Sequence, residues 1–293
     1  MKIGFLGLGL MGAGMAGQLL AKGYDLALWN RNPARLERFG AGMARIAESP
    51  ADAARGAEIV FAMLADDTAS RAVWLGTDGA LAAMARDAVA VECSTLTADW
   101  VRELAEVATG RGLGFADAPV TGSRAQAEAG QLRFLASGTP GTIDRVRPAL
   151  LAMGSKVVDM GSAGNGALVK LINNFLCGVQ GAALAEALVM AERGGLDIAQ
   201  AVEVLNDGAP GSPFQIMLSQ RMLARDYRPN FSAKMMAKDL GYAVAQLAEA
   251  GIDPATGNAA RKRFLAASAD DLEGDVAQVI ESVRQRTETI NGP

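Results

Sequence analysis

The sequence predicts an α/β protein with a doubly wound, mostly parallel sheet in its first half and an all-helical second half. In the first half, short apolar runs alternate with helical segments of a length that is typical of parallel sheets. From Gly164 to Gly195 the chain then reads as one unbroken helix of roughly thirty residues, far above the mean helix length. Only helical periodicity follows. We therefore expect two domains, at residues 1–162 and 163–293, joined by this long helix.

The first element is a short apolar run, Lys2–Leu6, that leads into three glycines. The glycines have the G-x-G-x-x-G spacing, and the segment after them, Ala13–Ala21, is proline-free and rich in Ala, Leu and Met. Because the chain has 34 glycines, the spacing alone would be weak, but strand, glycine turn and helix together are the context of a dinucleotide-binding (Rossmann) fingerprint. Such a loop admits a pyrophosphate against the helix N-terminus. The residues expected to contact the cofactor here are Gly7, Leu8, Gly9, Leu10, Met11 and Gly12.

A second strand is expected at Asp25–Trp29, and the residues after it lie where a dinucleotide fold reads the adenosine ribose. An NAD enzyme places a carboxylate there, whereas this chain has Asn30, Arg31 and Asn32. Without the carboxylate a 2′-phosphate is not repelled, and Arg31 can pair with it. The three residues are therefore expected to bind NADP(H). Alternatively, they form only a solvated turn before the next helix.

The first half contains further strand-like runs, at Glu58–Leu64, Ala88–Cys93, Gly114–Val120, Leu132–Ser137 and Lys156–Asp159. Helices are expected at Thr97–Thr109 and Gly141–Met153. Ligands in doubly wound sheets bind beyond the carboxyl ends of the strands. We therefore expect Met63, Leu64 and Thr95 to contact the cofactor, and the segment after Pro119 to lie near the substrate. Each of these segments could also be an ordinary strand-to-helix turn.

The composition excludes several classes of function. The net charge is −4 and a fifth of the 293 residues are charged, so we expect neither nucleic acid nor an anionic membrane as a partner. No uninterrupted apolar run approaches the ~18 residues of a membrane span, and no signal-peptide pattern precedes the first strand. Two isolated thiols, Cys93 and Cys177, suit a reducing cytosol and predict no metal site. We expect a cytoplasmic protein.

The chain has no histidine, so an acid–base catalyst must be Lys, Asp, Glu, Tyr or Cys. Near the start of the long helix, Lys170 and Asn174 are four residues apart and therefore share one face. Their sequence neighbours are apolar, which should lower the pKa of a lysine toward the range that proton transfer needs. Lys170 could equally be a lysine that extends to solvent from a mostly buried helix.

Four motifs, in this order and spacing, resemble those of the β-hydroxyacid dehydrogenase family over essentially the whole chain. They are Gly7–Ala16, Asp117–Ser123, Gly166–Asn174 and Lys238–Leu240. This family includes 3-hydroxyisobutyrate dehydrogenase, tartronate semialdehyde reductase and glyoxylate/succinic semialdehyde reductases. The resemblance implies reversible hydride transfer between a nicotinamide cofactor and a small hydroxy acid or semialdehyde.

By the same resemblance, Lys170 would be the catalytic acid/base and Asn174 its partner. The loop Thr121, Gly122 and Ser123 would receive the substrate carboxylate, and Lys238 would lie against the nicotinamide. Phe231 would line the substrate pocket together with Lys170 and Asn174. Lys238 can also be interpreted as part of a solvated cationic pair with Lys234, with Asp239 as ordinary surface charge.

The chain departs from the family at Ser123, where the family's usual Ser-Gly-Gly has its second glycine. The side chain makes this loop bulkier and adds a hydroxyl, which puts the family's best-known substrates in doubt. The Asn30–Arg31 pair is more similar to the NADPH-dependent glyoxylate/succinic semialdehyde reductases than to NAD-dependent members.

Two other interpretations of the fold stay open. One is an imine reductase, although such enzymes usually lack the lysine that is present at Lys170. The other is a non-catalytic NADP-binding protein. The long apolar helix further suggests a homodimer or homotetramer, because so much apolar surface needs covering.

Overall fold

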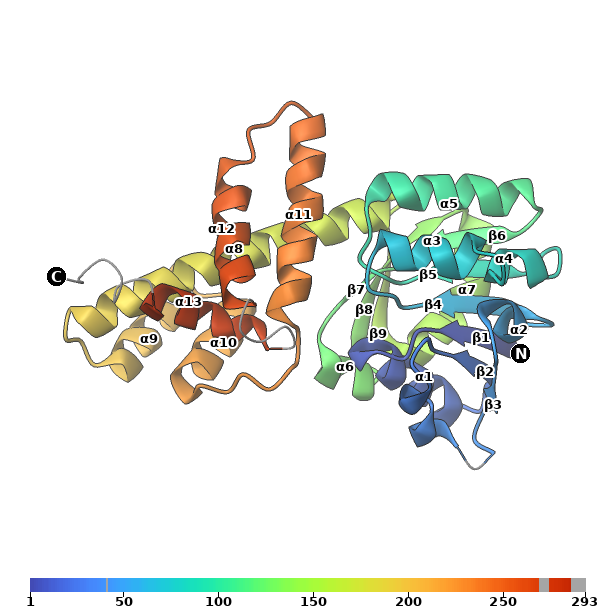
Figure 1. Cartoon of the computed structure of the whole chain (residues 1–293), viewed down its shortest axis with the longest axis horizontal. Coiled ribbons are helices and arrows are strands. Elements are labelled where there is room, and N and C mark those ends of the chain that lie inside the picture. Colours follow the sequence, from blue (N-terminus) through green and yellow to red (C-terminus); the bar gives the residue numbers. More distant parts are fainter. Residues whose placement is uncertain (41, 269–273, 286–293) are drawn as a thin grey trace. The chain divides into compact units, whose positions relative to one another are not determined.

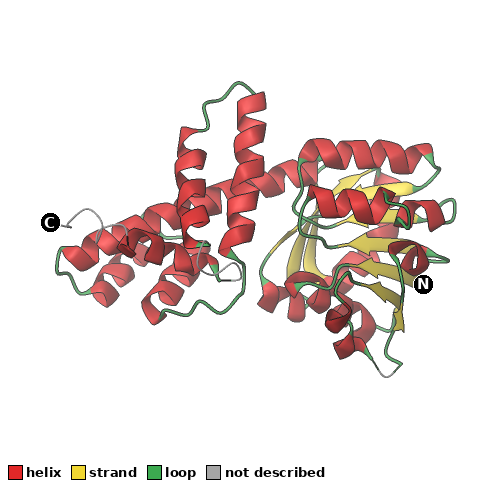
Figure 2. Ribbon diagram, viewed as in Figure 1, coloured by secondary structure: helices red, strands yellow, loops and turns green. Residues whose placement is uncertain are grey.

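The computed structural model describes residues 1–40, 42–268 and 274–285. It divides into two compact units, Met1–Lys170 and Leu171–Pro293, and the division falls within helix α8 (Asn165–Arg193). The first unit carries the sheet, and the described part of the second is built from helices (Figures 1 and 2). The predicted fold class, a doubly wound sheet followed by a helical domain with a long connecting helix, is confirmed.

The sheet has the strand order β3-β2-β1-β4-β5-β6-β8-β7, and β9 pairs with β8. The strands are β1 (Lys2–Leu6), β2 (Asp25–Trp29), β3 (Arg45–Ile46), β4 (Ile59–Ala62), β5 (Val89–Glu92), β6 (Gly114–Asp117), β7 (Val120–Thr121), β8 (Leu132–Gly138) and β9 (Gly154–Asp159). The pairs from β3 through β6 are parallel, whereas β8 runs antiparallel to β6 and β7. The chain progresses outward from β1 to β3 and then returns to β4 on the other side of β1. This reversal is where doubly wound sheets bind ligands.

Helices cover both faces of the sheet. They are α1 (Leu10–Ala21), α2 (Pro50–Ala54), α3 (Asp67–Leu75), α4 (Ala80–Ala83), α5 (Ala98–Gly110), α6 (Arg124–Glu128) and α7 (Pro140–Met153), with 3₁₀ turns at Pro33–Arg35 and Glu37–Phe39. One core cluster lies between the sheet and α1 with α7, and a second packs α2 to α5 on the opposite face (Figure 1). Both clusters rest on strands with continuous apolar runs, as expected of a sheet that is buried on two sides.

Most elements of the first unit follow the prediction. β2 has the predicted bounds, and the side chain of Thr97 caps α5 by accepting from Trp100 N–H at 3.3 Å. The extended run Gly114–Val120 is split into β6 and β7, because Pro119 has no N–H to donate to a ladder. β3 was not predicted, because it has only two residues, both exposed, and these show no alternation of apolar and polar side chains.

The second unit consists of helices that pack around α8. They are α9 (Ile198–Asp207), α10 (Pro213–Ala224), α11 (Ala233–Glu249), α12 (Ala255–Ala267) and α13 (Val279–Gln285), with a 3₁₀ turn at Val276–Gln278. Their buried side chains form a third core cluster that includes Leu188, Leu240 and Phe264. A Cβ on Gly178 of α8 would approach Leu240 to 2.8 Å, so the glycine allows α11 to pack closely.

Helix α8 is long and apolar enough to cross a membrane by length and composition, contrary to the expectation from uninterrupted runs. One such helix is weak evidence, because the core helix of a folded domain passes the same test. In its most apolar window, 44% of the residues are buried against the rest of the described structure.

Candidate active site

The glycine turn between β1 and α1 is tightly packed at Gly7 and Gly12 and open at Gly9. Gly7 has φ +95°, and a Cβ there would lie 2.3 Å from the carbonyl oxygen of Met63. A Cβ on Gly12 would lie 2.0 Å from the carbonyl oxygen of Gly7. At Gly9, in contrast, a Cβ meets nothing within 4 Å, and no side chain caps α1, which Gly9 precedes. The fold therefore dictates Gly7 and Gly12. At Gly9 the turn is open, and no side chain caps the first amides of α1, which begins with Leu10 and Met11.

The loop after β2 is tied to this glycine turn. The Oδ1 atom of Asn30 accepts a hydrogen bond from Leu8 N–H at 2.8 Å, and its Nδ2 donates to the carbonyl of Asn32 at 2.8 Å. The side chain of Asn32 accepts from Ala34 N–H at 3.1 Å and so caps the following turn. Both amides thus hold the loop, and the exposed Arg31 is the side chain that the loop presents to solvent.

A buried glutamate that sequence reasoning missed connects the loops after β4 and β5. Glu92 accepts hydrogen bonds from the Ser70 hydroxyl at 2.7 Å and the Trp74 indole at 2.8 Å through Oε2. Its Oε1 accepts from both the N–H and the hydroxyl of Ser94. The Ser94 hydroxyl in turn accepts from Leu64 N–H at 2.7 Å. Burial raises the pKa of Glu92, and the donated hydrogen bonds oppose that rise.

Glu92 thereby fixes two loops that are predicted to contact the cofactor. One is the loop after β4, which contains Met63 and Leu64, and the other is the loop after β5, in which Thr95 follows Ser94. The sequence contained one signal for this role, an acidic residue at the end of an otherwise apolar strand.

The loop Thr121–Ser123 lies between β7 and α6 in the first unit. Gly122 has φ +122°, and a Cβ there would meet Leu132 Cδ2 at 3.0 Å, so only glycine suits this position. Ser123 has φ −120°, a conformation that a side chain tolerates without strain. The Gln126 Oε1 atom accepts from Ser123 N–H at 2.9 Å and also from its hydroxyl. Within the structure, Gln126 therefore occupies the Ser123 N–H.

Lys170 and Asn174 lie one turn apart on α8, and Asn174 belongs to a polar cluster in the second unit. Asn174 is buried and donates to Asp239 Oδ2 at 2.6 Å. Lys238 Nζ lies 2.9 Å from Asp239 Oδ1 and 5.0 Å from the centroid of the Tyr242 ring. Asp239 is 1% exposed, so its interpretation as surface charge was wrong. The structure thus joins Lys238 to Asn174 through the buried carboxylate of Asp239.

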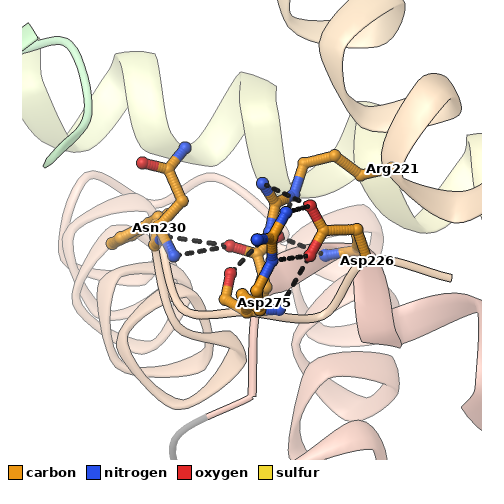
Figure 3. Close-up of polar contacts among 7 residues, drawn as sticks. Arg221, Asp226, Asn230 and Asp275 are labelled. Atoms are coloured by element: carbon orange, nitrogen blue, oxygen red, sulfur yellow. Dashed lines mark hydrogen bonds and ion pairs between the residues drawn. The ribbon is translucent and has the colours of Figure 1, made fainter. Parts of the chain in front are cut away.

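Phe231 lies in a loop that another buried carboxylate, Asp275, holds in place. Asp275 accepts from the N–H groups of Asn230 and Phe231 at 3.0 and 3.1 Å, and it pairs with Arg221 at 3.2 Å (Figure 3). Arg221 also pairs with Asp226 at 3.6 Å. The half-buried Phe231 therefore has a defined position within the second unit.

The comparisons with known proteins identify the family to which the chain belongs. Residues 2–161 match the NAD-binding domain of 6-phosphogluconate dehydrogenase, and residues 164–283 match the NAD-binding domain of NADP-dependent 3-hydroxyisobutyrate dehydrogenase. Glyoxylate/succinic semialdehyde reductase 1 of Arabidopsis thaliana is 33% identical over 285 residues, which are 97% of this chain and 99% of that protein. This chain belongs to the β-hydroxyacid dehydrogenase family.

Solved structures of this family have the same fold. The 3-hydroxyisobutyrate dehydrogenase of Mycobacterium tuberculosis with L-serine has a TM-score of 0.86 and 30% identity, over 97% of this chain and 99% of that one. Both matching family models describe nicotinamide-dinucleotide-binding domains, so the cofactor class of the family is a nicotinamide dinucleotide.

Another relative is named as a nuclear factor and not as a dehydrogenase or reductase. The human cytokine-like nuclear factor N-PAC is 36% identical over 244 residues, which are 83% of this chain but only 44% of N-PAC. The chain therefore spans less than half the length of this relative.

Proposed function

We propose that this protein is an NADP(H)-dependent reductase of small carboxylate-bearing aldehydes, such as glyoxylate or succinic semialdehyde, and that Lys170 is its general acid/base. The observation that carries the proposal is the Lys170–Asn174 pair on α8, whose Asn174 is fixed by Asp239. An amide that is held by a buried carboxylate has one orientation, which is what a partner of a proton donor requires. Likeness to the Arabidopsis reductase supports the substrate class.

The loop after β2 supports NADP(H) rather than NAD(H). An acceptor for the ribose 2′-hydroxyl would normally be a carboxylate at the end of this strand. Asn30 occupies that position, and its Oδ1 is already engaged by Leu8 N–H. Arg31 next to it is exposed and can bind a 2′-phosphate through charge-assisted hydrogen bonds.

In the proposed reaction the nicotinamide supplies or accepts the hydride, and the chain supplies binding, orientation and one proton. The loop Thr121–Ser123 takes up the substrate carboxylate. The Lys170 ammonium donates its proton to the carbonyl oxygen while the carbonyl carbon is reduced, and water reprotonates the lysine afterwards. In the reverse direction the neutral lysine accepts the hydroxyl proton. In this proposal Asn174 orients the ammonium or the substrate oxygen, and the family resemblance assigns Lys238 to the nicotinamide end of the cofactor.

Two alternatives have specific counterarguments. An imine reductase would not need the lysine that this chain keeps at Lys170. The other is a binding protein without activity, and N-PAC, whose name is that of a nuclear factor rather than of a dehydrogenase, is the relative that raises it. Lys170, Asn174 and Lys238 are all present, and a protein that only binds a dinucleotide has no use for a positioned proton donor.

The exposed apolar side chains of α8 support the expected homodimer or homotetramer. Ile172, Leu176 and Met190 are all more than half exposed, and association would cover them. Light scattering of the purified protein tests this part of the proposal, because a strictly monomeric mass would contradict it.

A substrate panel tests the function itself. The protein is mixed with NADPH and, in turn, glyoxylate, succinic semialdehyde, tartronate semialdehyde and methylmalonate semialdehyde, while the absorbance of the reduced nicotinamide is followed. Consumption with at least one aldehyde is expected, and Lys170→Ala should slow it by at least about 100-fold while NADPH still binds. If NADPH binds but no aldehyde is reduced, the proposal is contradicted and the result favours the binding-only alternative.

A further inference from the structure

The helix that carries Lys170 has no capping side chain of its own. The residue before α8 is Gly164, with φ +90°, and the first helical residues are Asn165, Gly166 and Ala167. The first amides of a helix lack partners within the helix and must find them elsewhere. Here they find them on another strand. Asp117, the last residue of β6, accepts from Gly164 N–H through Oδ1 and from Ala167 N–H through Oδ2, each at 3.0 Å.

A buried serine completes this cap. The Ser137 hydroxyl on β8 donates to Asp117 Oδ2 at 3.0 Å and accepts from Gly166 N–H at 2.6 Å. Asp117 and Ser137 are 1% and 0% exposed. A Cβ on Gly166 would lie 2.2 Å from the Leu135 carbonyl oxygen, so the helix start is pressed directly against the strands. The first turn of α8 therefore has one position relative to β6 and β8.

The site requires a carboxylate. Each oxygen of Asp117 faces a backbone N–H, which can only donate, so an asparagine would place its own NH₂ against a donor in either orientation. Burial raises the pKa of Asp117, and the hydrogen bonds from Gly164, Ala167 and Ser137 oppose the rise. The partial positive charge of the helix N-terminus favours the anion as well.

The position of Asp117 in the chain links this cap to chemistry. Lys170 follows Ala167 by three residues, about one turn further along α8. In the other direction, Asp117 directly precedes the segment that leads into the Thr121–Ser123 loop. We propose that Asp117 is the positioning residue for Lys170, and that it fixes the proton donor relative to the substrate-carboxylate loop. This inference rests on the proposed function of Lys170.

The expected effect follows from the sensitivity of proton transfer to distance. A misplacement of about 1 Å at a reacting group can cost about 100-fold in rate. Asp117→Asn keeps the side-chain volume but forces the start of α8 away from β6. Its kcat should therefore fall by about 10- to 100-fold, while the Kd for NADPH stays within about twofold of wild type, because Asp117 is not among the residues proposed to bind the cofactor.

Four variants separate positioning from general destabilisation. They are Asp117→Asn, Lys170→Ala, the double variant, and Val146→Ala as a stability control in the buried face of α7. Single-turnover hydride transfer is measured with enzyme in excess, together with steady-state kcat and Tm. If Asp117 acts through Lys170, Asp117→Asn has no further effect in the Lys170→Ala background, because the group that it positions is gone. Val146→Ala should lower Tm and leave kcat within about twofold of wild type.

Other results would overturn the inference. One is that kcat of Asp117→Asn stays within twofold of wild type. The other is that, in the double variant, the fold loss in kcat equals the product of the losses in the two single variants. If Asp117→Asn does not fold, Ser137→Ala removes one donor to Asp117 and the acceptor of Gly166 N–H, and a smaller fall in kcat without a change in NADPH binding is expected. Unchanged kcat in folded Ser137→Ala would then refute the inference. If Lys170→Ala alone keeps full turnover, the proposed function fails, and this outcome is visible without any Asp117 variant.

Discussion

Asn174 donates a hydrogen bond to Asp239 at 2.6 Å, and the same carboxylate pairs with Lys238 at 2.9 Å. The two oxygens of Asp239 thus serve two different partners, and both partners were predicted to act in the active site. Because Asp239 is buried, it cannot exchange either contact for water at low cost. The arrangement makes Asp239 the residue that holds Asn174 and Lys238 together.

Asp239→Asn should therefore lower both stability and turnover. An asparagine can still accept from Asn174, but its NH₂ then faces the Lys238 ammonium, and two donors repel. Leaving one charge of a mostly buried pair uncompensated destabilises by up to about 3 kcal/mol, discounted here because Lys238 is partly exposed. Thermal unfolding and kcat are measured for Asp239→Asn and for Asp253→Asn, an exposed control. Equal behaviour of the two variants would contradict the assigned role.

Arg31→Ala tests the cofactor preference. Loss of a charge-assisted contact to the 2′-phosphate should reduce kcat/KM with NADPH by about 10- to 100-fold and leave the value with NADH unchanged. The matched control is Arg111→Ala, because Arg111 is exposed at the end of α5. A wild-type protein that prefers NADH would contradict the proposal before any variant is made.

Ser123→Gly tests whether the departure from the family's usual glycine sets the substrate range. Ser123 caps a short helix, and replacement of such a serine by glycine costs only a few tenths, about 0.3 kcal/mol. Removal of the hydroxyl also releases Gln126 from one of its two contacts with Ser123. We expect KM to change more than kcat, and kcat/KM for methylmalonate semialdehyde to rise relative to that for glyoxylate.

Ser49→Gly is the control for this change, because Ser49 also precedes a short helix, α2, where its hydroxyl accepts from Asp52 N–H. It should reproduce the small change in stability without any change in substrate preference. If both variants keep the wild-type order of substrates, Ser123 does not set that order.

How much the sequence predicts depends on where the partners of each residue lie in the chain. The glycine turn, β2 and the capped start of α5 follow from neighbouring residues, and these were predicted with nearly correct bounds. The contacts of Asp117 with Gly164 and of Asn174 with Asp239 join residues 47 and 65 positions apart. A pattern of neighbouring residues in the sequence cannot predict contacts between residues so far apart. Buried carboxylates were therefore missed or assigned to the surface, because their burial is created only when distant strands and helices meet.

Glu92 is one such residue, and Glu92→Gln is expected to weaken the loops after β4 and β5. A glutamine must place its NH₂ either against the Trp74 indole N–H or against Ser94 N–H, so one buried donor loses its acceptor. Such a loss costs about 1–3 kcal/mol, and KM for the cofactor should rise because Leu64 loses its anchor through Ser94. The exposed Glu106→Gln is the matched control.

The pH dependence of this variant has a definite sign. Because burial raises the pKa of Glu92, its contribution to wild-type stability is full below the pKa of an unfolded glutamate, about 4.3, and declines as pH rises through the raised value. Glutamine does not titrate. The difference in Tm between wild type and Glu92→Gln should therefore shrink as pH increases from about 4 toward neutrality. A difference that grows over this range would show that Glu92 has a lowered pKa in the folded protein, and would contradict the role of burial at this site.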